Sequence, residues 1–351
     1  MANASTRRVD SLRRGDVFAP LDKYCADHCA PLRKAILCGE VRLSALVRSD
    51  YPGQQMPRTM LPEVSTVGFW DATSPQHWGL DWHRNEGLEL TYLARGRTAF
   101  SVENENFTLG SGDMTIMRPW QRHRVGAPNT GPSRLCWLIL DVDVRRPDQT
   151  WRWPDWLILT PADLKHLTTL LSQNEQAVWH ANDEIGSCFE RIASLTQTKH
   201  PLQVESRLRL YINELFISLR ELLEKEKATL DPHLTSTHRN VELFLNRLPH
   251  HLEDPWTLPK MAEQCGLSSS AFTQYCCRIT NQTPIKYLVH CRIEAAKQLL
   301  AVKPSLSITD IAFTCGFQSS QYLATVFRQK TGLSPRAWRE TQATSVPSRA
   351  I

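Results

Sequence analysis

The sequence lacks any long apolar segment free of charge. No uncharged apolar run in its 351 residues reaches the roughly 20 residues that a membrane-spanning helix needs. The first thirty residues also contain no apolar core of the kind that marks an export signal. These absences predict a cytoplasmic protein with no membrane partner. The length predicts two domains with room for a third small element.

Cysteines at disulfide or metal-binding spacing are missing too. The ten cysteines are scattered, and several fall on expected helical core positions. Without an export signal the compartment is expected to be reducing, so we interpret the cysteines as small buried apolar residues. The one crowded group, Cys25, His28 and Cys29, lacks the usual zinc spacing and has no second pair nearby. We predict no metal there.

The most informative stretch runs from Ser305 to Arg339. Apolar residues recur there at spacings of three and four, Gly316 interrupts them, and a second apolar run follows a serine pair. This pattern predicts a helix, a tight turn and a second helix. The exposed face of the second helix has short uncharged side chains, whereas a merely solvated face would have Lys and Glu. Such a face suits contact with base edges in the major groove of DNA.

A second copy of the pattern lies earlier in the chain. The offset is fifty residues over the first helix and fifty-one over the second, so the later copy has one extra residue. Asn281 and Gly332 occupy matching positions and both tolerate the left-handed backbone that ends a helix. Pro284 and Pro335 each follow a Thr or Ser cap, where a first helical turn accepts proline.

One amphipathic helix is predicted between the copies, from Pro284 to Val302. At about 1.5 Å per residue it would be about 30 Å long. Successive major-groove segments on one side of B-DNA are about 34 to 36 Å apart. A linker of this length would hold two DNA-reading helices on the same side of the duplex.

At this point the residues resemble a known family. The matching segments are CGFQSSQYLATVFRQKTGLSPRAWR, the linker's RIEAAKQLL, and CGLSSSAFTQYCCRITNQTPIKYL. They are similar to the DNA-binding domain of AraC/XylS-type bacterial transcription regulators, over Asp254 to Arg339. The resemblance implies that double-stranded DNA and, for activation, RNA polymerase are partners.

The resemblance also implies which residues read bases. In the two copies they are Ser270, Thr273 and Gln274, followed by Ser320, Gln321, Ala324 and Thr325. Members of the family often have Arg at some of these positions and this chain does not. Their preferred bases therefore do not transfer to it.

Positive charge is concentrated in the same region. From Thr237 to Glu340 there are 12 Lys and Arg residues against 7 Asp and Glu residues, so this segment holds the whole formal net charge of +5. Its basic side chains are candidates for phosphate contacts, which position a protein on DNA without specifying sequence. The candidates are Arg278, Lys286, Arg328, Lys330, Arg336 and Arg339. A mildly basic solvated surface is the alternative interpretation of each.

From Val64 to Val144 the sequence consists of short runs separated by Gly, Pro and Asn, which is typical of an antiparallel barrel or sandwich. The expected strands are Val64–Trp70, Gly79–His83, Leu88–Ala94, Gly96–Val102, Glu105–Leu109, Asp113–Met117 and Leu135–Val142. Upstream, Lys34–Cys38 and Val41–Leu46 are expected to be short strands and Met1–Asp16 a polar tail.

Phe107 to Val125 resembles the second half of a cupin, and His83 and Glu89 stand where the first cupin motif supplies inward-facing polar groups. The resemblance is to the sensory barrel that commonly precedes this DNA-binding domain. It implies a small-molecule effector, such as a sugar or an organic acid. The candidate pocket residues are Trp82, His83, Glu89, Trp120 and His123.

A metal in this barrel is an open question for the sequence. An enzymatic cupin offers two histidines spaced by one residue, then Glu, then a distant His, a set that iron or zinc accepts. Here the sequence reads His83-Arg84-Asn85, so an amide replaces one imidazole. His83, Glu89 and His123 would still supply three ligands, although we favour hydrogen-bonded polar groups at a barrel mouth. We therefore predict neither a metal nor another cofactor.

Helices are expected after the barrel, at Thr160–Leu171, Ile185–Thr196 and Gln203–Lys227. The last has a long apolar stripe, which leaves two alternatives open. The stripe would face a second subunit and form a homodimer, or it would pack against the barrel.

Together these patterns predict an α+β protein. The expected parts are an N-terminal arm (1–60), a cupin-like antiparallel β-barrel (61–157), a helical linker and dimerisation region (158–236), an all-α DNA-binding domain with two helix-turn-helix units (237–342) and a tail (343–351). The expected function is effector-responsive transcription regulation, with activation favoured and no catalytic residues. The alternatives are a metal-dependent cupin enzyme fused to a DNA-tethering module, and a constitutive DNA-binding protein whose barrel serves only assembly.

Overall fold

The computed structural model describes residues 29–48, 51–103, 105–126, 129–303 and 305–344. The described part of the chain divides into two compact units between Ser236 and Thr237. The expectation for Met1–Asp16 and most of the Cys25 to Cys29 group lie outside the described residues. None of the helices in these ranges combines the length and apolarity that a bilayer crossing requires.

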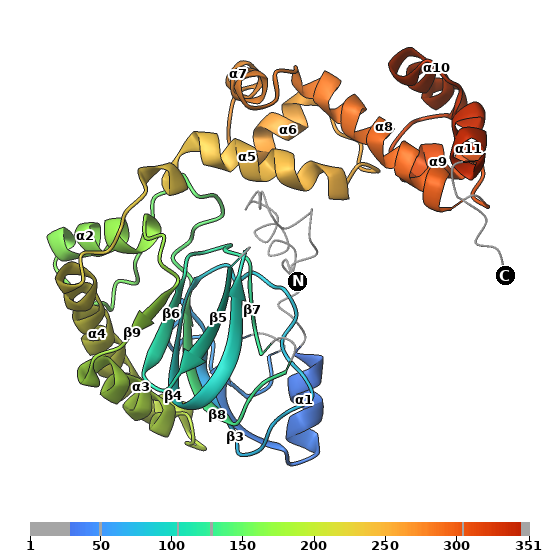
Figure 1. The fold of residues 1–351 in the computed structure, drawn as a ribbon. Helices are drawn as coiled ribbons and strands as arrows, with labels where there is room; N and C mark the ends of the chain where they lie inside the picture. The colour runs from blue at the N-terminus through green and yellow to red at the C-terminus, as the bar shows by residue number, and fades with distance from the viewer. Residues whose placement is uncertain (1–28, 49–50, 104, 127–128, 304, 345–351) are drawn as a thin grey trace, which may run out of the picture. The chain divides into compact units, whose positions relative to one another are not determined.

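The N-terminal unit is built around a sheet that contains nine strands over its described residues (Figure 1). The strands are β1 (Val41–Val47), β2 (Gln54–Gln55), β3 (Val64–Ala72), β4 (Leu88–Val102), β5 (Glu105–Gly110), β6 (Asp113–Met117), β7 (His123–Val125), β8 (Ser133–Leu140) and β9 (Val178–His180). Their order is β2-β1-β3-β8-β4-β6-β9, with β5 and β7 paired to β4. Apart from β1 with β2, the pairs are antiparallel, as predicted.

Strand β4 replaces two expected strands, because Gly96 makes a bend within it rather than a turn. Gly96 has a φ of +91°, and a Cβ on it would lie 1.9 Å from the carbonyl oxygen of Pro132. The register with β8 shifts between Leu93 and Arg95. Before the bend β4 pairs with β6 and β8, and after it with β5 and β7. One long strand thus pairs with β5, β6, β7 and β8.

Two other strand expectations are wrong. Lys34–Cys38 falls at the end of helix α1 (Ala30–Leu37), where an early proline sets the first turn and Leu32 is buried. Gly79–His83 forms a loop, in which only His83 makes an isolated bridge, to His123. The other expected strands are confirmed with small shifts at their ends.

A separate apolar core lies on each face of the sheet. Side chains alternate along β3, so Phe69 joins one apolar core and Trp70 the opposite one. Helices α2 (Pro161–Ser172), α3 (Asp183–Leu195) and α4 (Pro201–Lys225) cover the first face (Figure 1). The apolar stripe of α4 is buried in that core, with Leu208 and Phe216 fully enclosed. The stripe therefore packs within its own chain.

The C-terminal unit is helical throughout its regular structure. Its helices are α5 (Thr237–Arg247), α6 (Leu258–Gln264), α7 (Ser269–Thr280), α8 (Pro284–Val302), α9 (Ile308–Thr314), α10 (Ser320–Thr331) and α11 (Pro335–Thr344), with a 3-10 turn at Leu248–His250; another such turn, Pro232–Thr235, ends the N-terminal unit.

Two separate apolar cores lie within this unit. One contains Phe244 and Phe272, and the other contains Phe317 and Phe327. We call α5 to α7 with the N-terminal half of α8 the first subdomain, and the C-terminal half of α8 with α9 to α11 the second subdomain. Because α8 supplies side chains to both cores, it joins α7 at one end to α10 at the other (Figure 1).

Each subdomain has the predicted helix, turn and helix. The side chains of Ser268 and Ser319 accept hydrogen bonds from the backbone at the start of α7 and α10. The same helices end at Asn281, with a φ of 57°, and at Gly332, with a φ of 79°. The sequence repeat is therefore confirmed as a repeat of local structure.

Candidate DNA interface and barrel site

Helix α7 presents uncharged polar groups to solvent. Ser270 and Gln274 are exposed and Thr273 is half-buried. On the opposite side of the helix, Phe272 and Cys276 are buried in the core of the first subdomain. These three positions therefore offer hydrogen-bonding groups without a charge, and the exposed Arg278 lies one turn further along the helix.

Helix α10 has the same division into two faces. Gln321 and Thr325 are exposed, and Ser320 and Ala324 are half-buried. The apolar side points into the core of the second subdomain, where Phe327 is fully enclosed. None of the seven residues predicted to read bases is buried.

Helix α8 sets the distance between these two faces. Its 19 residues give a length of about 28 Å. Leu288 and Cys291 join the core beneath α7, and Ile293 and Leu300 join the core beneath α10. The length of α8 is comparable with the distance between consecutive major-groove segments, which is about 34 to 36 Å.

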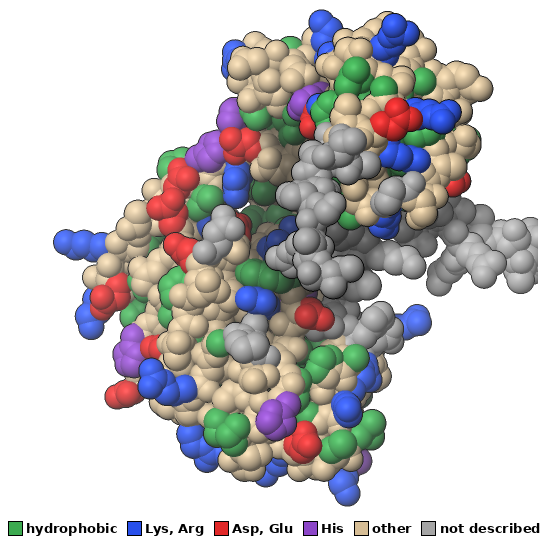
Figure 2. Space-filling model, turned by 45° about the vertical axis from the view of Figure 1, so that its right-hand side comes forward, with side chains coloured by type: hydrophobic (Ala, Val, Ile, Leu, Met, Phe, Trp, Pro, Cys, Tyr) green, Lys and Arg blue, Asp and Glu red, His purple; other side chains and the backbone are tan. Residues whose placement is uncertain are grey.

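The candidate phosphate contacts lie mostly on open surface. Arg339 is the exception, because its Nη2 donates to the carbonyl oxygen of Leu306 at 2.7 Å. In Figure 2 the Lys and Arg side chains visible on the C-terminal unit are spread among uncharged groups rather than gathered in one patch. The exposed candidates are Arg278, Lys286, Arg328, Lys330 and Arg336.

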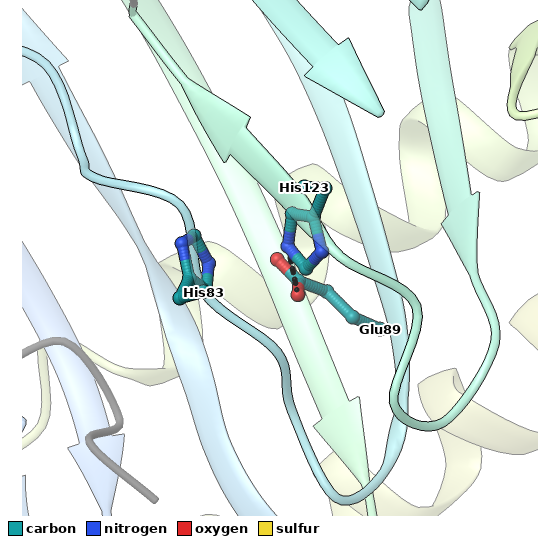
Figure 3. Close-up of side chains that lie close together, drawn as sticks. All are labelled: His83, Glu89 and His123. Atoms are coloured by element: carbon teal, nitrogen blue, oxygen red, sulfur yellow. Dashed lines mark ion pairs between the residues drawn. The ribbon is translucent and has the colours of Figure 1, made fainter. Parts of the chain in front are cut away.

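In the barrel, His83, Glu89 and His123 converge from a loop and two strands (Figure 3). The backbones of His83 and His123 exchange two hydrogen bonds of 3.0 Å, and their ring centroids are 4.3 Å apart. Leu88 and Leu90 point into the apolar core on the face of the sheet that α2, α3 and α4 cover. Alternation along β4 therefore turns Glu89 to the opposite side, toward the histidines.

A buried ion pair joins two of these residues. The Nε2 of His123 lies 2.9 Å from Oε2 of Glu89, and the side chains are 1% and 8% exposed. The Nδ1 of His123 lies 2.9 Å from the carbonyl oxygen of Gln121. A carbonyl can only accept, so this nitrogen holds a proton. By the same reasoning, His83 donates from Nδ1 to the carbonyl of Asp81 at 2.7 Å.

The two partners shift each other's pKa. Burial by itself lowers the pKa of His123, but the charge and hydrogen bond of Glu89 outweigh burial, so this pKa is raised. Burial by itself raises the pKa of Glu89, but His123 outweighs it, with help from His83 and Asn85, so this pKa is lowered. Between the two pKa values both partners are charged.

The same three residues are where a metal ion would bind. Their ligand atoms all lie within 4.8 Å of one another, and two imidazoles with a carboxylate suit iron or zinc. Both Nδ1 atoms face backbone carbonyls, as they commonly do in metal-binding histidines. Asn85, in place of a further imidazole, donates to Glu89. The donor set fits an ion, and the buried Nε2 of His123, which has no hydrogen bond of good geometry among the described residues, faces Glu89 as an ion-pair partner.

Trp82 and Trp120 make their contacts elsewhere. The ring of Trp82 packs against Arg122 and Arg124, whose guanidinium carbons lie 4.6 and 4.7 Å from its centroid. The indole of Trp120 donates to the carbonyl of Val144 at 2.8 Å. The structure thus brings together three of the five residues expected in the pocket.

Sequence reasoning missed an aromatic cluster in the same part of the barrel. The ring of Trp137 lies 5.6 Å from that of Tyr51 and 5.9 Å from that of Trp70. The buried Nε1 of Trp70 has no hydrogen-bond partner among the described residues. Phe100, in the same core, lies 6.1 Å from His123. Only the strand register puts Trp70 and Trp137 on one face, so no local signal would have found them.

Comparison with known proteins gives two family matches and many relatives. Residues 261–341 match a helix-turn-helix domain, and residues 72–141 match a cupin domain. The HTH-type transcriptional activator RhaR of Salmonella arizonae is 26% identical over 73% of this chain and 86% of its own length. The activator RhaS of Escherichia coli is 24% identical over 74% of this chain and 87% of its own length. The crystal structure of a DNA-binding transcriptional dual regulator from Escherichia coli K-12 is 26% identical, covers 30% of this chain and 93% of its own, and has a TM-score of 0.27.

A cupin barrel followed by paired helix-turn-helix subdomains defines a DNA-binding transcription regulator. The matched helix-turn-helix and cupin domains, together with the relatives RhaR and RhaS, make the chain similar to AraC-type regulators with an N-terminal cupin-like domain. It is a regulator and not the enzyme that was the alternative. The fold, the DNA partner and the class of function predicted from the sequence are confirmed.

Proposed function

We propose that this chain is an effector-controlled transcription activator in which α7 and α10 read two consecutive major-groove segments. The observation that supports this most is that the predicted reading positions of α7 and α10 are uncharged, unburied and held at opposite ends of α8. Its relatives RhaR and RhaS are named transcriptional activators, which supports activation. Contact with RNA polymerase and a cytoplasmic location are further parts of the proposal.

Gln274 and Gln321 are the principal base readers in this proposal. Both side chains are exposed, and an amide can donate to and accept from one adenine edge. The shorter groups make the remaining base contacts, from Ser270, Thr273, Ser320, Ala324 and Thr325. The phosphate contacts come from Arg278, Lys286, Arg328, Lys330 and Arg336.

The effector binds beside His83, Glu89 and His123. A carboxylate and an imidazolium can exchange hydrogen bonds with a sugar or an organic acid, and the adjacent aromatic core supplies apolar contact. To control activity, the effector must bind the DNA-competent arrangement more tightly, since equal affinity for both arrangements shifts nothing.

A homodimer is proposed on narrower grounds. The predicted stripe of α4 is buried in its own chain, but Leu202 and Leu210 on the same helix are 58% and 57% exposed. They are eight residues apart, so they lie close to one side of the helix. These two leucines would be the centre of contact with a second copy.

Selection from randomised DNA tests the DNA-reading part of the proposal. The purified full-length chain is expected to enrich two short half-sites whose centres lie about 10 base pairs apart. We call the pair the composite site. Enrichment of no shared sequence would contradict base reading by α7 and α10.

Thermal unfolding with sugars, sugar acids and aromatic acids tests the effector part. A specific ligand at about 100 times its dissociation constant stabilises the protein by about 2.7 kcal/mol. The stabilisation should be lost in His83→Ala, and the ligand should change affinity for the composite site. If no ligand of these classes binds while DNA is read normally, the barrel serves assembly alone.

A further inference from the structure

The carbonyl of Leu252 lies where the two DNA-binding subdomains meet. Leu252 belongs to the core of the first subdomain and is 3% exposed. Its oxygen accepts hydrogen bonds from Nε of Arg292 at 3.1 Å and from Nη2 at 2.9 Å. The same Nη2 also donates to the carbonyl of Asp254 at 3.0 Å. Arg292 lies in the middle of α8, so its hydrogen bonds connect α8 to the loop before α6.

The second subdomain reaches the same oxygen through Gly316, in the turn between α9 and α10. A Cβ on this glycine would lie 1.7 Å from the Leu252 oxygen and 2.7 Å from Nη2 of Arg292. Real Cβ atoms do not approach a backbone oxygen so closely, so only glycine fits. Backbone of the second subdomain therefore packs directly on backbone of the first.

The matching turn of the first subdomain is held in another way. There the carbonyl of Cys265 accepts a hydrogen bond of 2.8 Å from the fully buried Asn240, and both residues lie in the first subdomain. The sequence repeat thus places equivalent glycines, Gly266 and Gly316, in turns with different anchors. Contact with the other subdomain is made by the Gly316 turn.

We propose that the junction of Arg292, Leu252 and Gly316 is a positioning contact that fixes the orientation of α10 relative to α7. Helix α8 sets the distance between the subdomains, and the buried side chains that it supplies to the two cores come from opposite halves of the helix. The junction adds a contact at the middle of α8 that resists rotation of one subdomain about the other. This inference rests on the proposed reading of DNA by α7 and α10.

Gly316→Ala tests the junction, and the chain offers a matched control. Gly332 has a φ of +79° against +77° for Gly316, but a Cβ on Gly332 would meet nothing within 4 Å. Gly332→Ala therefore imposes the same backbone strain without the clash. Both variants are made in the full-length chain and tested on DNA selected by the unaltered protein.

The expected result is a loss of coupling between the half-sites. Gly316→Ala should bind the composite site about 100-fold more weakly, because independent subdomains lose the advantage of linked binding. Its binding to DNA with one half-site scrambled should not change. In a new selection it should accept half-sites at varied spacing, whereas Gly332→Ala should keep the original spacing. Equal spacing preference in the two variants would overturn the proposal, as would an equal loss on every DNA.

A second variant and a second readout keep the test independent of folding and of DNA. Arg292→Lys keeps the charge but cannot donate from two nitrogens to the same carbonyl, so it should loosen the spacing even if Gly316→Ala fails to fold. Hydrogen exchange without DNA should quicken at residues 252–256 and 316–318 in both junction variants. Unchanged exchange there would overturn the junction, whereas failure of the unaltered chain to select DNA would overturn only the proposed function.

Discussion

The DNA-binding unit and the barrel assemble their candidate sites differently. In the DNA-binding unit each group of readers lies within one helix, α7 or α10. In the barrel, His83, Glu89 and His123 come from a loop and two strands. A helix brings residues three or four apart together on its own face, whereas the barrel cluster exists only after distant segments have paired. The reading faces should therefore tolerate single replacements that the barrel site does not.

The largest effect is expected where a reading helix loses its support. Phe327 is fully buried in the core of the second subdomain, and Phe327→Ala should lower the free energy of unfolding by about 3 to 5 kcal/mol. Thermal unfolding and binding to the composite site measure the change. Tyr322→Ala, at a 49% exposed position of the same helix, is the control. Equal stability of the two variants would contradict the assigned core.

Glu89→Gln should weaken the barrel by about 3 kcal/mol, because it leaves His123 buried without its charged partner. The folded-state pKa of His123 is raised. Its contribution to the free energy of unfolding is therefore full below the usual pKa of about 6.5 and is lost as pH rises through the raised pKa. The pKa of Glu89 is lowered. Its contribution to the free energy of unfolding is therefore present above the usual pKa of a glutamate and is lost as pH falls through the lowered pKa.

Urea unfolding at several pH values measures this difference between the unaltered chain and Glu89→Gln. The difference should be largest at about pH 5 to 6.5 and should shrink toward alkaline pH. The control is Glu224→Gln, which removes the partner of the half-exposed His166. A Glu89→Gln deficit that does not vary with pH would contradict the ion pair.

Replacing a reader should affect one half-site and leave the fold intact. Gln274→Ala and Gln321→Ala should each cost about 1 to 3 kcal/mol of binding and relax the preference at one or two base pairs. Selection from randomised DNA should show the two losses in different half-sites. Gln298→Ala, an exposed amide on α8, should change neither. Unchanged selection by both reader variants would refute the assignment.

The smallest effect is expected from a phosphate contact. Arg328→Ala should weaken binding to all sequences alike and lower the slope of affinity against salt by about 0.9, the share of one phosphate. Titration at several salt concentrations measures the slope. Altered base preference in this variant would make Arg328 a reading residue instead.

The helical unit could be predicted from the sequence because its signals are local. A serine cap, an apolar spacing of three and four, and Asn281 or Gly332 at the end define each reading helix within about a dozen residues. The contact of Gly316 with Leu252 was not predictable, since it joins residues far apart in the chain.

The barrel was less predictable because pairing between distant strands decides its details. Gly96 indicates a turn locally, but the approach of Pro132 makes it a bend inside β4. Trp82 is next to His83 in the sequence yet packs on Arg122 and Arg124. His83 and Glu89 could be found from their motif, whereas the neighbouring aromatic core required the register of β3 with β8.

The most direct measurement of the central claim is binding to a composite site whose half-sites have been moved apart by half a helical turn, about 5 base pairs. Two reading helices fixed to one α8 cannot then reach both half-sites from the same side of the duplex. Affinity should fall about 100-fold, to that of a single half-site. Recovery of affinity when about 10 base pairs are inserted would require a linker that can stretch. Full affinity at the half-turn spacing would contradict a rigid pair of readers.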